Sequence, residues 1–400
     1  MWPVPSFILL LSVTLLAVAE IDLVSTETKH YEPIFICPLK RCSCPSKTRL
    51  IAPGVGFALE MSYGTVSIKY ENGTIAPVAQ VAAPADYIAL MEHLATSPIK
   101  RMHDGSRPPP GVDESENKGK SLWIRFHIVR FIKKLLWLPS TPEVKTLANM
   151  ATKLRREAET KLGRRVKGAA MSSPDRVRLT RQEIGDIFDY LRMEDLVAEK
   201  DNFFFNELTS MAAASAGYGD GLCKIYTNAY ECTVEERHAP YLEILQLDYS
   251  QSALTAALGG ANTVRRSYCG NTFVDLDLGN AQLLVEGSSE GEYWHRVEKR
   301  IRDFAGSSRL DRLMLTGESA SDPRFIQAIK NALSMAELPL GFDIHFAPVS
   351  NHSEYFLFAT SIGAAELAKR RQEGMGNCWL PEKCRGERVS EDIEAVKSEL

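Results

Sequence analysis

Alternating hydrophobic and polar residues predict β-strands at several places along the chain. Val66–Tyr70 alternates and is followed by Asn72-Gly73, a strong two-residue hairpin signal, so its partner strand is expected over Ile75–Ala79. A second hairpin is expected over Asn271–Glu286, around Gly279-Asn280. Further strands are predicted at Val166–Met171, Tyr241–Leu247 and Arg312–Thr316.

Apolar residues at helical spacing predict helices between these strands. The clearest helix runs from Thr141 to Gly163, because Pro142 stands in its first turn and the glycine provides a stop. The other predicted helices are Ser250–Leu258, Glu292–Phe304, Pro323–Met335 and Ser361–Arg371. Because strands and helices alternate in this way, the chain is assigned to the α/β class.

The stretch Leu122–Leu138 is apolar but carries four basic side chains. On a helical wheel, the basic residues lie largely opposite an apolar face made of Ile124, Ile128, Phe131, Ile132 and Leu135. We favour a core element, helical or extended, whose long basic side chains reach solvent. The alternative is a helix that makes a peripheral contact with an anionic membrane surface.

The N-terminal segment Ser6–Ala19 is apolar, has no charged side chain and ends in Ala17-Val18-Ala19, the pattern that a signal peptidase cuts. We expect residues 1–19 to be a cleavable signal peptide, with an uncleaved membrane anchor as the alternative. The last four residues, KSEL, differ at one position from the endoplasmic-reticulum retention signal. The expected location is the secretory pathway, either the lumen of the reticulum or outside the cell.

An oxidising compartment favours disulfides between cysteines that lie near one another in the sequence. The candidates are Cys37, Cys42, Cys44, Cys223, Cys232, Cys378 and Cys384. Their pairing cannot be deduced from the sequence. Zinc binding is the weaker interpretation, because the spacings are irregular and no histidine is near. Glycosylation sequons begin at Asn72 and Asn351.

Charge and composition shifts outline the domains. A net charge of −4, with acidic and basic residues mixed, argues against a nucleic-acid partner. Residues 20–49 are predicted to be a cysteine-bearing N-terminal segment. The predicted parts that follow are a first lobe at 50–240, with a Pro- and Gly-rich linker at 104–120, a second lobe at 241–371 and a tail at 372–400.

Four places combine a strand end, a turn and residue types suited to phosphate chemistry. Asp277 can hold a magnesium-bound water, and Gly279 lets backbone N–H groups approach a phosphate, although a plain hairpin is the alternative. Asp248 can position a water or simply cap a helix. The turn 316–319 leads into a helix N-terminus, where anions bind. The fourth place is the turn 62–64, which has no strong ligand.

In their order and spacing, these motifs resemble the nucleotide-binding domain of heat-shock-protein-70-type chaperones, within the actin-like ATPase superfamily. Val55–Glu60 is similar to its first phosphate loop, and Leu247–Leu258 to its connecting helix with the catalytic acid. Asp277–Gly279 is similar to the second phosphate loop, and Leu313–Pro323 to the adenosine turn. The resemblance covers residues 50–371 and implies a two-lobed, ribonuclease-H-like fold that binds ATP and magnesium.

The departures from the family are as informative as the matches. Ala58 stands where the family has an acid, while Glu60 and Met61 replace a glycine and a threonine. Glu60 would repel phosphate, and Met61 is bulky. Glu318 replaces a glycine of the adenosine turn. Too few residues follow Glu286 for the subdomain that forms the other wall of the adenine pocket, and a substrate-binding domain is missing. The resemblance therefore implies a degenerate member.

Three functions fit these observations. The favoured one is a pseudo-ATPase of the secretory pathway with a binding or regulatory role beside an unidentified protein partner, such as another chaperone. The second is a divergent ATPase, with Asp248 and Asp277 as catalytic acids and Asp277 as the magnesium ligand. The third is a secreted interaction protein stapled by disulfides, without any cofactor. The resemblance places the vestigial nucleotide pocket at Ser62, Tyr63, Gly279, Gly317 and Ser319.

Overall fold

The computed structural model describes residues 40–41, 45–97, 128–136, 138–177, 179–197, 207–284, 289–306, 308–333, 343–344, 352–374 and 378–379. The signal peptide 1–19, the linker 104–120 and the KSEL end lie outside these residues and stay predictions. The same holds for Asn351 and for the side chains of Cys37, Cys42, Cys44, Cys378 and Cys384.

The first lobe is built on a mixed sheet. Its strands are β2 (Gly54–Leu59), β3 (Tyr63–Lys69), β4 (Ile75–Ala82), β5 (Gly168–Ser173), β6 (Glu194–Asp195) and β7 (Leu208–Thr209). The order is β4-β3-β2-β5-β6, with β7 paired to β5. The first three strands form an antiparallel meander, and β5 returns parallel to β2. A parallel return requires a crossover, which the helices between β4 and β5 provide.

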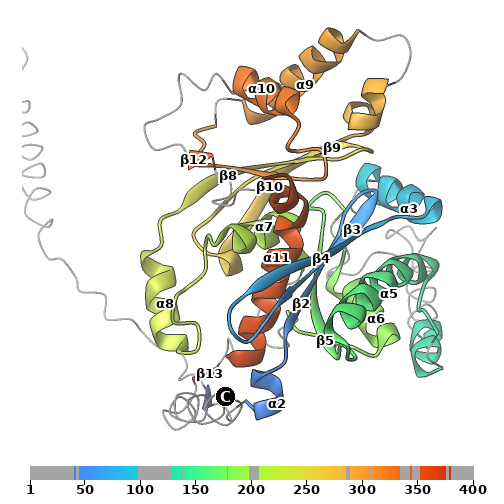
Figure 1. The fold of residues 1–400 in the computed structure, drawn as a ribbon, viewed down its shortest axis with the longest axis vertical. Helices are drawn as coiled ribbons and strands as arrows, with labels where there is room; N and C mark the ends of the chain where they lie inside the picture. Colours follow the sequence, from blue (N-terminus) through green and yellow to red (C-terminus); the bar gives the residue numbers. More distant parts are fainter. Residues whose placement is uncertain are drawn as a thin grey trace, which may run out of the picture. The chain divides into compact units, whose positions relative to one another are not determined.

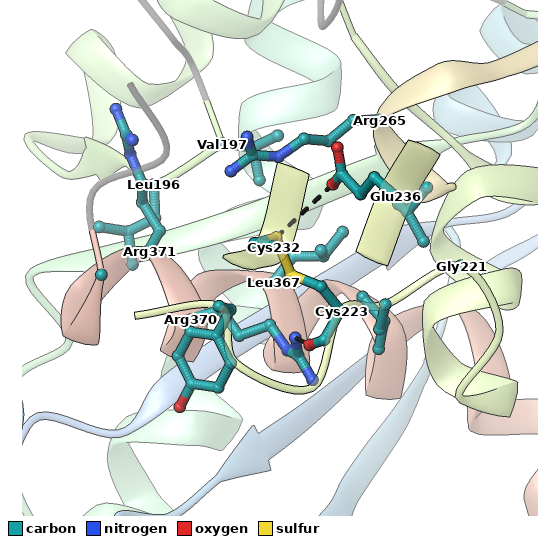
Figure 2. Close-up of a pocket in the computed structure, with 14 residues that line it drawn as sticks. Leu196, Val197, Gly221, Cys223, Cys232, Glu236, Arg265, Leu367, Arg370 and Arg371 are labelled. Carbon is teal, nitrogen blue, oxygen red and sulfur yellow. Dashed lines mark hydrogen bonds between the residues drawn. A yellow bond between two sulfur atoms is a disulfide. The ribbon is translucent and has the colours of Figure 1, made fainter. Parts of the chain in front are cut away.

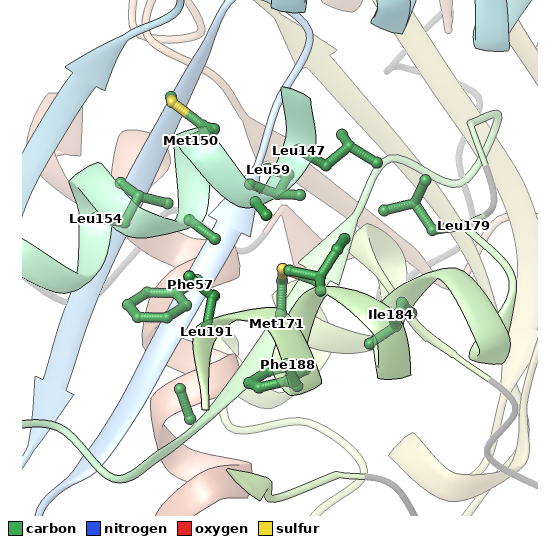
Figure 3. Close-up of a cluster of buried hydrophobic side chains, with 14 of the residues drawn as sticks. Phe57, Leu59, Leu147, Met150, Leu154, Met171, Leu179, Ile184, Phe188 and Leu191 are labelled. Atoms are coloured by element: carbon green, nitrogen blue, oxygen red, sulfur yellow. The ribbon is translucent and has the colours of Figure 1, made fainter. Parts of the chain in front are cut away.

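Apolar side chains between this sheet and its helices form the first core (Figure 3). The helices are α3 (Ala85–Thr96), α5 (Pro142–Leu162) and α6 (Arg181–Leu191). Phe57 and Leu59 of β2 lie in one cluster with Leu147 of α5, Met171 of β5 and Phe188 of α6. Every residue of β2 is buried, as expected for a central strand covered on both faces.

The second lobe is built on another mixed sheet. Its strands are β8 (Leu242–Tyr249), β9 (Leu254–Ala261), β10 (Ser267–Asp275), β11 (Arg312–Thr316) and β12 (Asp343–Ile344), in the order β10-β9-β8-β11-β12. Helices α9 (Glu290–Ala305) and α10 (Pro323–Ala332) pack together, and their apolar faces join the core of this sheet. The remaining elements are β1 (Lys40–Arg41), α2 (Lys47–Leu50), α8 (Ala229–His238), η1 (Val264–Arg266), η2 (Leu276–Leu278), η3 (Asn280–Leu284) and β13 (Cys378–Trp379).

The two sheets share one topology. In each, a three-stranded antiparallel meander is followed by two strands that pair parallel, next to the first strand of the meander. The fold is thus mixed α/β with two lobes, which confirms the predicted α/β class.

Helices α7 (Ser210–Tyr218) and α11 (His352–Glu373) lie between the two sheets (Figure 1). Helix α11 packs on β2, β3 and β5, and α7 shares an apolar cluster with β8, β9 and β11. The two helices cross in backbone contact, because a Cβ added to Gly363 would lie 1.7 Å from the carbonyl oxygen of Ala213. A Cβ at Gly56 would likewise lie 2.2 Å from the carbonyl oxygen of Ser361, so β2 also touches the backbone of α11.

Local signals predicted the ends of a few elements correctly, whereas the last helix, expected over Ser361–Arg371, begins already at His352. The Thr141 hydroxyl accepts a hydrogen bond from the Val144 N–H, Pro142 opens α5, and Gly163 ends the helix at a φ of 63°. The hairpin of β3 and β4 turns at Asn72-Gly73, where Gly73 has a φ of 83°. Strand β11 has the predicted bounds.

Two predictions in the second lobe are wrong. Residues 254–258 belong to strand β9 and not to a helix, because pairing with β8 on one side and β10 on the other outweighs the helical preference of an alanine-rich run. The expected hairpin over Asn271–Glu286 does not form either. Strand β10 pairs back onto β9 and is followed by two short 3-10 turns, which the Tyr293 hydroxyl holds by donating to the carbonyls of Leu278 and Gly279.

The stretch 122–138 also differs from the favoured prediction where it is described. Residues 128–135 are helical, but their apolar side chains are exposed and their basic side faces the lobe. Buried Arg130 forms an ion pair with buried Asp186 of α6. A buried carboxylate is strongly destabilising without a partner, and this requirement turns the basic side inward. In the described part of the chain, no helix has the length and apolarity needed to cross a bilayer.

The crossing of α7 and α11 gives a direct test of this packing. We expect Gly363→Ala to lower the free energy of unfolding by about 3 kcal/mol, since its Cβ would overlap the backbone of α7 and force the helices apart. Urea denaturation followed by circular dichroism measures the change. Gly185→Ala in α6 is the matched control: its Cβ would meet nothing within 4 Å, so the variant should gain about 0.5–1 kcal/mol. Equal stabilities would contradict the close contact.

Candidate functional site

Three acidic side chains line one cavity where the strand-end turns of the two lobes face each other. Glu60 lies in the β2–β3 turn, Asp175 follows β5, and Asp248 lies near the end of β8. All three are buried, with exposed fractions of 4%, 5% and 6%. They line a cavity of about 10 Å³ together with Ser210, Gln246 and Thr255. A space of this size holds about one water molecule.

Short polar contacts position Asp248. The Thr316 hydroxyl at the end of β11 donates to Asp248 Oδ2 over 2.9 Å. Gln246 Nε2 donates to the hydroxyl oxygens of Thr316 and Ser210 over 3.1 and 2.9 Å. Its Oε1 is buried and has no hydrogen-bond partner among the described residues. The amide thus leaves one acceptor for a donor in the cavity.

Asp175 is held by the N-terminus of α7. Its Oδ2 accepts a hydrogen bond of 2.8 Å from the backbone N–H of Met211. The Thr209 hydroxyl accepts from the next N–H group, that of Ala212, over 3.3 Å. Such caps satisfy N–H groups that a helix leaves unpaired at its start. Asp175 therefore has a structural role as well as its place in the cavity.

Burial raises the pKa of Glu60 well above its ordinary value, and the nearby charges of Asp248 and Asp175 raise it further. Burial also raises the pKa of Asp248 to about 6, and Glu318 adds to this effect while the hydrogen bond from Thr316 opposes it. Both carboxyl groups therefore hold their protons to a higher pH than an exposed acid does, and Asp248 titrates at about pH 6.

Glu318 joins the two lobes near the site. Its Oε1 accepts from the backbone N–H of Gln251 over 3.0 Å, and its Oε2 accepts from Gln80 Nε2 over 2.5 Å. Gln251 lies in the β8–β9 turn and Gln80 on β4. Buried Tyr63 lies close by. Burial raises the pKa of its phenol, and the charges of Asp248, Glu60 and Glu318 raise it further.

The structure brings together several residues of the predicted nucleotide pocket. Ser62 and Tyr63 stand beside Glu60 at the β2–β3 turn. Ser319 donates its N–H to the carbonyl oxygen of Tyr249 over 3.0 Å. A Cβ at Gly317 would lie 2.3 Å from that same oxygen, so only glycine fits there. Gly279 packs equally closely on the backbone of the β8–β9 turn, residues 251–253.

The structure does not bring Asp277 to Asp248. Asp277 is exposed on η2 and does not line the cavity. Sequence reasoning included Glu60 only as an obstacle to phosphate, and it missed Asp175 and Gln246. The sequence does carry a signal for Asp175. This residue follows buried strand β5, which runs parallel to β2, the strand before Glu60. The ends of parallel strands meet at one edge of a sheet.

Aromatic side chains fill the space under the turn at Gly317. The ring of Tyr249 stacks on Phe325 of α10, with centroids 4.3 Å apart, and meets Trp294 edge to face at 6.1 Å. Its hydroxyl lies 3.0 Å from that of Tyr293. These contacts bind β8 to α9 and α10 and occupy the interior beside the predicted adenosine turn.

A second concavity lies away from the acids, at the end of α11 (Figure 2). Its volume is about 80 Å³, and Arg370, Tyr226 and the disulfide between Cys223 and Cys232 line it. Among the described residues, the only three potential metal ligands within 4.8 Å of one another are Glu236 and these two cysteines. Because both sulfurs are in the disulfide, they are not available to a metal.

Asn72 of the first sequon is exposed at the tip of the β3–β4 hairpin. Its Oδ1 accepts hydrogen bonds from the backbone N–H and the hydroxyl of Thr74, over 3.0 and 2.7 Å. The side chain is thus open to solvent, as an acceptor of a glycan must be.

Comparison with known proteins adds no family assignment. No protein-family model matches the chain, and no curated protein matches it. The fold class therefore rests on the topology of the two sheets, and the function must be argued from the site itself.

The buried acids predict that the protein is more stable in mild acid. The folded-state pKa of Asp248, about 6, lies above the value near 3.9 of an unfolded chain, so only the folded state keeps this proton between the two values. The free energy of unfolding should then fall by about 1 kcal/mol between pH 5 and 7.5 through Asp248 alone, with Glu60 adding to the fall. Thermal unfolding at several pH values measures this slope.

Asp248→Asn should reduce the slope and raise stability at pH 7.5, because the amide is neutral and its oxygen still accepts from Thr316. The matched control is Asp277→Asn on the exposed η2 turn, which should leave the slope unchanged. If Asp248→Asn kept the full pH dependence of the free energy of unfolding, this dependence would arise from groups other than Asp248.

Proposed function

We propose that the chain is a degenerate, non-catalytic relative of the heat-shock-70-type actin-like ATPases, with a binding or regulatory role in the secretory pathway. The observation that carries this proposal is the small, acid-lined cavity between the lobes. Three buried carboxyl groups, those of Glu60, Asp175 and Asp248, stand where an ATPase of this kind would hold phosphates and metal.

Topology supports the relationship to actin-like ATPases. A pair of mixed sheets with the same strand order is what a two-lobed ribonuclease-H-like fold requires. The match between β2–β3 and β8–β9 also changes the motif assignment. Each hairpin begins a sheet and turns at the interlobe site, which supports the turn 250–253 after Asp248, rather than Asp277–Gly279, as the counterpart of a second phosphate loop.

Size and charge argue against nucleotide in this cavity. A volume of about 10 Å³ excludes even one phosphate group, which is several times larger than a water molecule. Buried Met61 and Tyr63 close the first turn. Any ionised acid in the cavity would repel phosphate, and burial would strengthen that repulsion. ATP and magnesium therefore do not fit the residues present.

A binding role follows from what the fold retains. Phosphoryl transfer needs several preorganised groups at once, and this site has acids in place of hydrogen-bond donors to phosphate. The two lobes and their helical layers are nevertheless well packed. A stable fold without room for its expected ligand can still present a binding surface to a partner protein. Our proposed partner is another chaperone of the same compartment.

The alternative is a divergent ATPase that opens its cleft to bind nucleotide. The gathering of Asp248, Tyr63, Gly317 and Ser319 around the β8–β9 turn favours this possibility. It would require the Glu318 bridge between Gln80 and Gln251 to break.

Titration calorimetry with magnesium-ATP on purified residues 20–400 separates the two functions. We expect no heat of binding at millimolar nucleotide, because the cavity has neither the volume nor the donors for phosphates. Glu318→Ala serves as the second arm: it removes the bridge between the lobes without touching the three acids, and it should still bind no nucleotide.

Micromolar affinity in the wild type, lost in Asp248→Ala, would contradict the proposal and establish the divergent ATPase. Binding that appears only in Glu318→Ala would also contradict it, since the cavity would then be closed by the bridge and not by the acids.

A further inference from the structure

Large apolar side chains are concentrated on the surface of residues 128–138. Of the thirteen exposed large hydrophobic residues in the described chain, seven belong to this short stretch. Phe131 and Leu135 have the highest exposed fractions among all thirteen, 69% and 68%. The other five are Ile128, Val129, Ile132, Leu136 and Leu138. Exposed apolar patches of this kind mark interaction surfaces.

The orientation of this helix is fixed by its basic side. Arg130 Nε donates to Asp186 of α6, and its Nη2 donates to the carbonyl oxygen of Gln182 over 2.9 Å. Lys134 Nζ lies 3.0 Å from Asp186 Oδ1 and 2.5 Å from Asp189 Oδ2. Because both partners of the Arg130–Asp186 pair are buried, rolling the helix over would leave a buried charge unpaired. The apolar side is therefore held toward the outside.

We propose that residues 128–138 form a surface that docks on a lipid membrane by inserting apolar side chains. Docking by this surface is independent of nucleotide binding in the interlobe cavity. At 100° per residue, the exposed apolar positions from Ile128 to Leu136 cover an arc of about 160°. A helix that pairs with a second helix needs only a narrow apolar seam, whereas a helix lying in a membrane interface buries about half its circumference.

The sequence around the helix fits the same occupant. In the sequence, tryptophans occur at positions 123 and 137, on either side of the helix, and tryptophan is frequent where membrane proteins meet the interface between lipid and water. No acidic residue occurs between Leu122 and Leu138, so nothing in the stretch repels phosphate headgroups. The stretch is too short, and has too many basic residues, to span the bilayer.

The contacts of the basic side chains indicate which force drives docking. Arg130 and Lys134 are engaged with α6, and Lys133 Nζ donates to the carbonyl oxygen of Ser140 over 3.2 Å. These charges are turned toward the lobe, so they contribute little attraction to an anionic surface. Insertion of Phe131, Leu135 and their neighbours supplies the binding free energy instead. Docking should accordingly occur on neutral lipid and depend weakly on salt.

Vesicle flotation with purified residues 20–400 tests the proposal. Vesicles of phosphatidylcholine, with and without phosphatidylserine, should both carry the protein upward, and added salt should change the bound fraction little. Phe131→Ser with Leu135→Ser should weaken binding at least about tenfold, since each removes one large inserted side chain. Their high exposure predicts an unchanged unfolding temperature, which is the check on folding.

The matched control is Tyr268→Ser with Ile225→Ser. These residues are exposed to 67% and 48% but lie far from 128–138 in the sequence, on β10 and before α8. The control should bind vesicles like the wild type. The proposal is overturned if the wild type stays with the soluble fraction or if the Phe131/Leu135 variant floats as well as the wild type. It is also overturned if light scattering finds a dimer that this variant abolishes while no protein floats, because the surface would then bind a second copy.

Discussion

The contact between helices α7 and α11 determines how the two sheets are placed. Helix α11 lies on the first sheet, where Ser361 Oγ and Ser67 Oγ are 2.7 Å apart, and α7 packs on the second sheet. Gly363 and Gly217 allow the helices to cross in backbone contact, so no side-chain layer separates them. Close packing of this kind is stiff, since interiors cannot absorb even small changes in volume. The separation of the lobes is therefore set by small residues.

This spacing brings the carboxyl groups of the interlobe site together. With the helices in contact, the turn at Glu60 faces the strand end at Asp248, and Asp175 joins them from the start of α7. Burial between the closely packed lobes raises the pKa of both Glu60 and Asp248. The charges of Asp248 and Asp175 raise the pKa of Glu60 further, and that of Glu318 adds to the pKa of Asp248.

Sequence reasoning succeeded where structure is decided locally. The α5 helix could be predicted to within a residue because Thr141, Pro142 and Gly163 determine its ends without help from the rest of the chain. It failed for β9, where an alanine-rich run is a strand only because strands lie on both sides of it. It failed again for the exposed helix, because nothing in the local pattern announces that Asp186, 56 residues after Arg130, is a buried partner. Asp175 was missed, and Glu60 was included only as an obstacle to phosphate, for the same reason: their proximity to Asp248 is a property of the packed helices.

The proposed docking surface lies on the face of the first sheet opposite to α11. Side chains of β2 alternate between its faces: Phe57 enters the core beneath α5 and α6, whereas Gly56 touches α11. The exposed helix is anchored to α6, on the far face from α11. A membrane docked there would contact the α6 side of the first lobe and leave the contact between α7 and α11 unchanged. Docking can therefore proceed with the cavity closed, so a protein with this structure needs no nucleotide cycle to present its apolar surface.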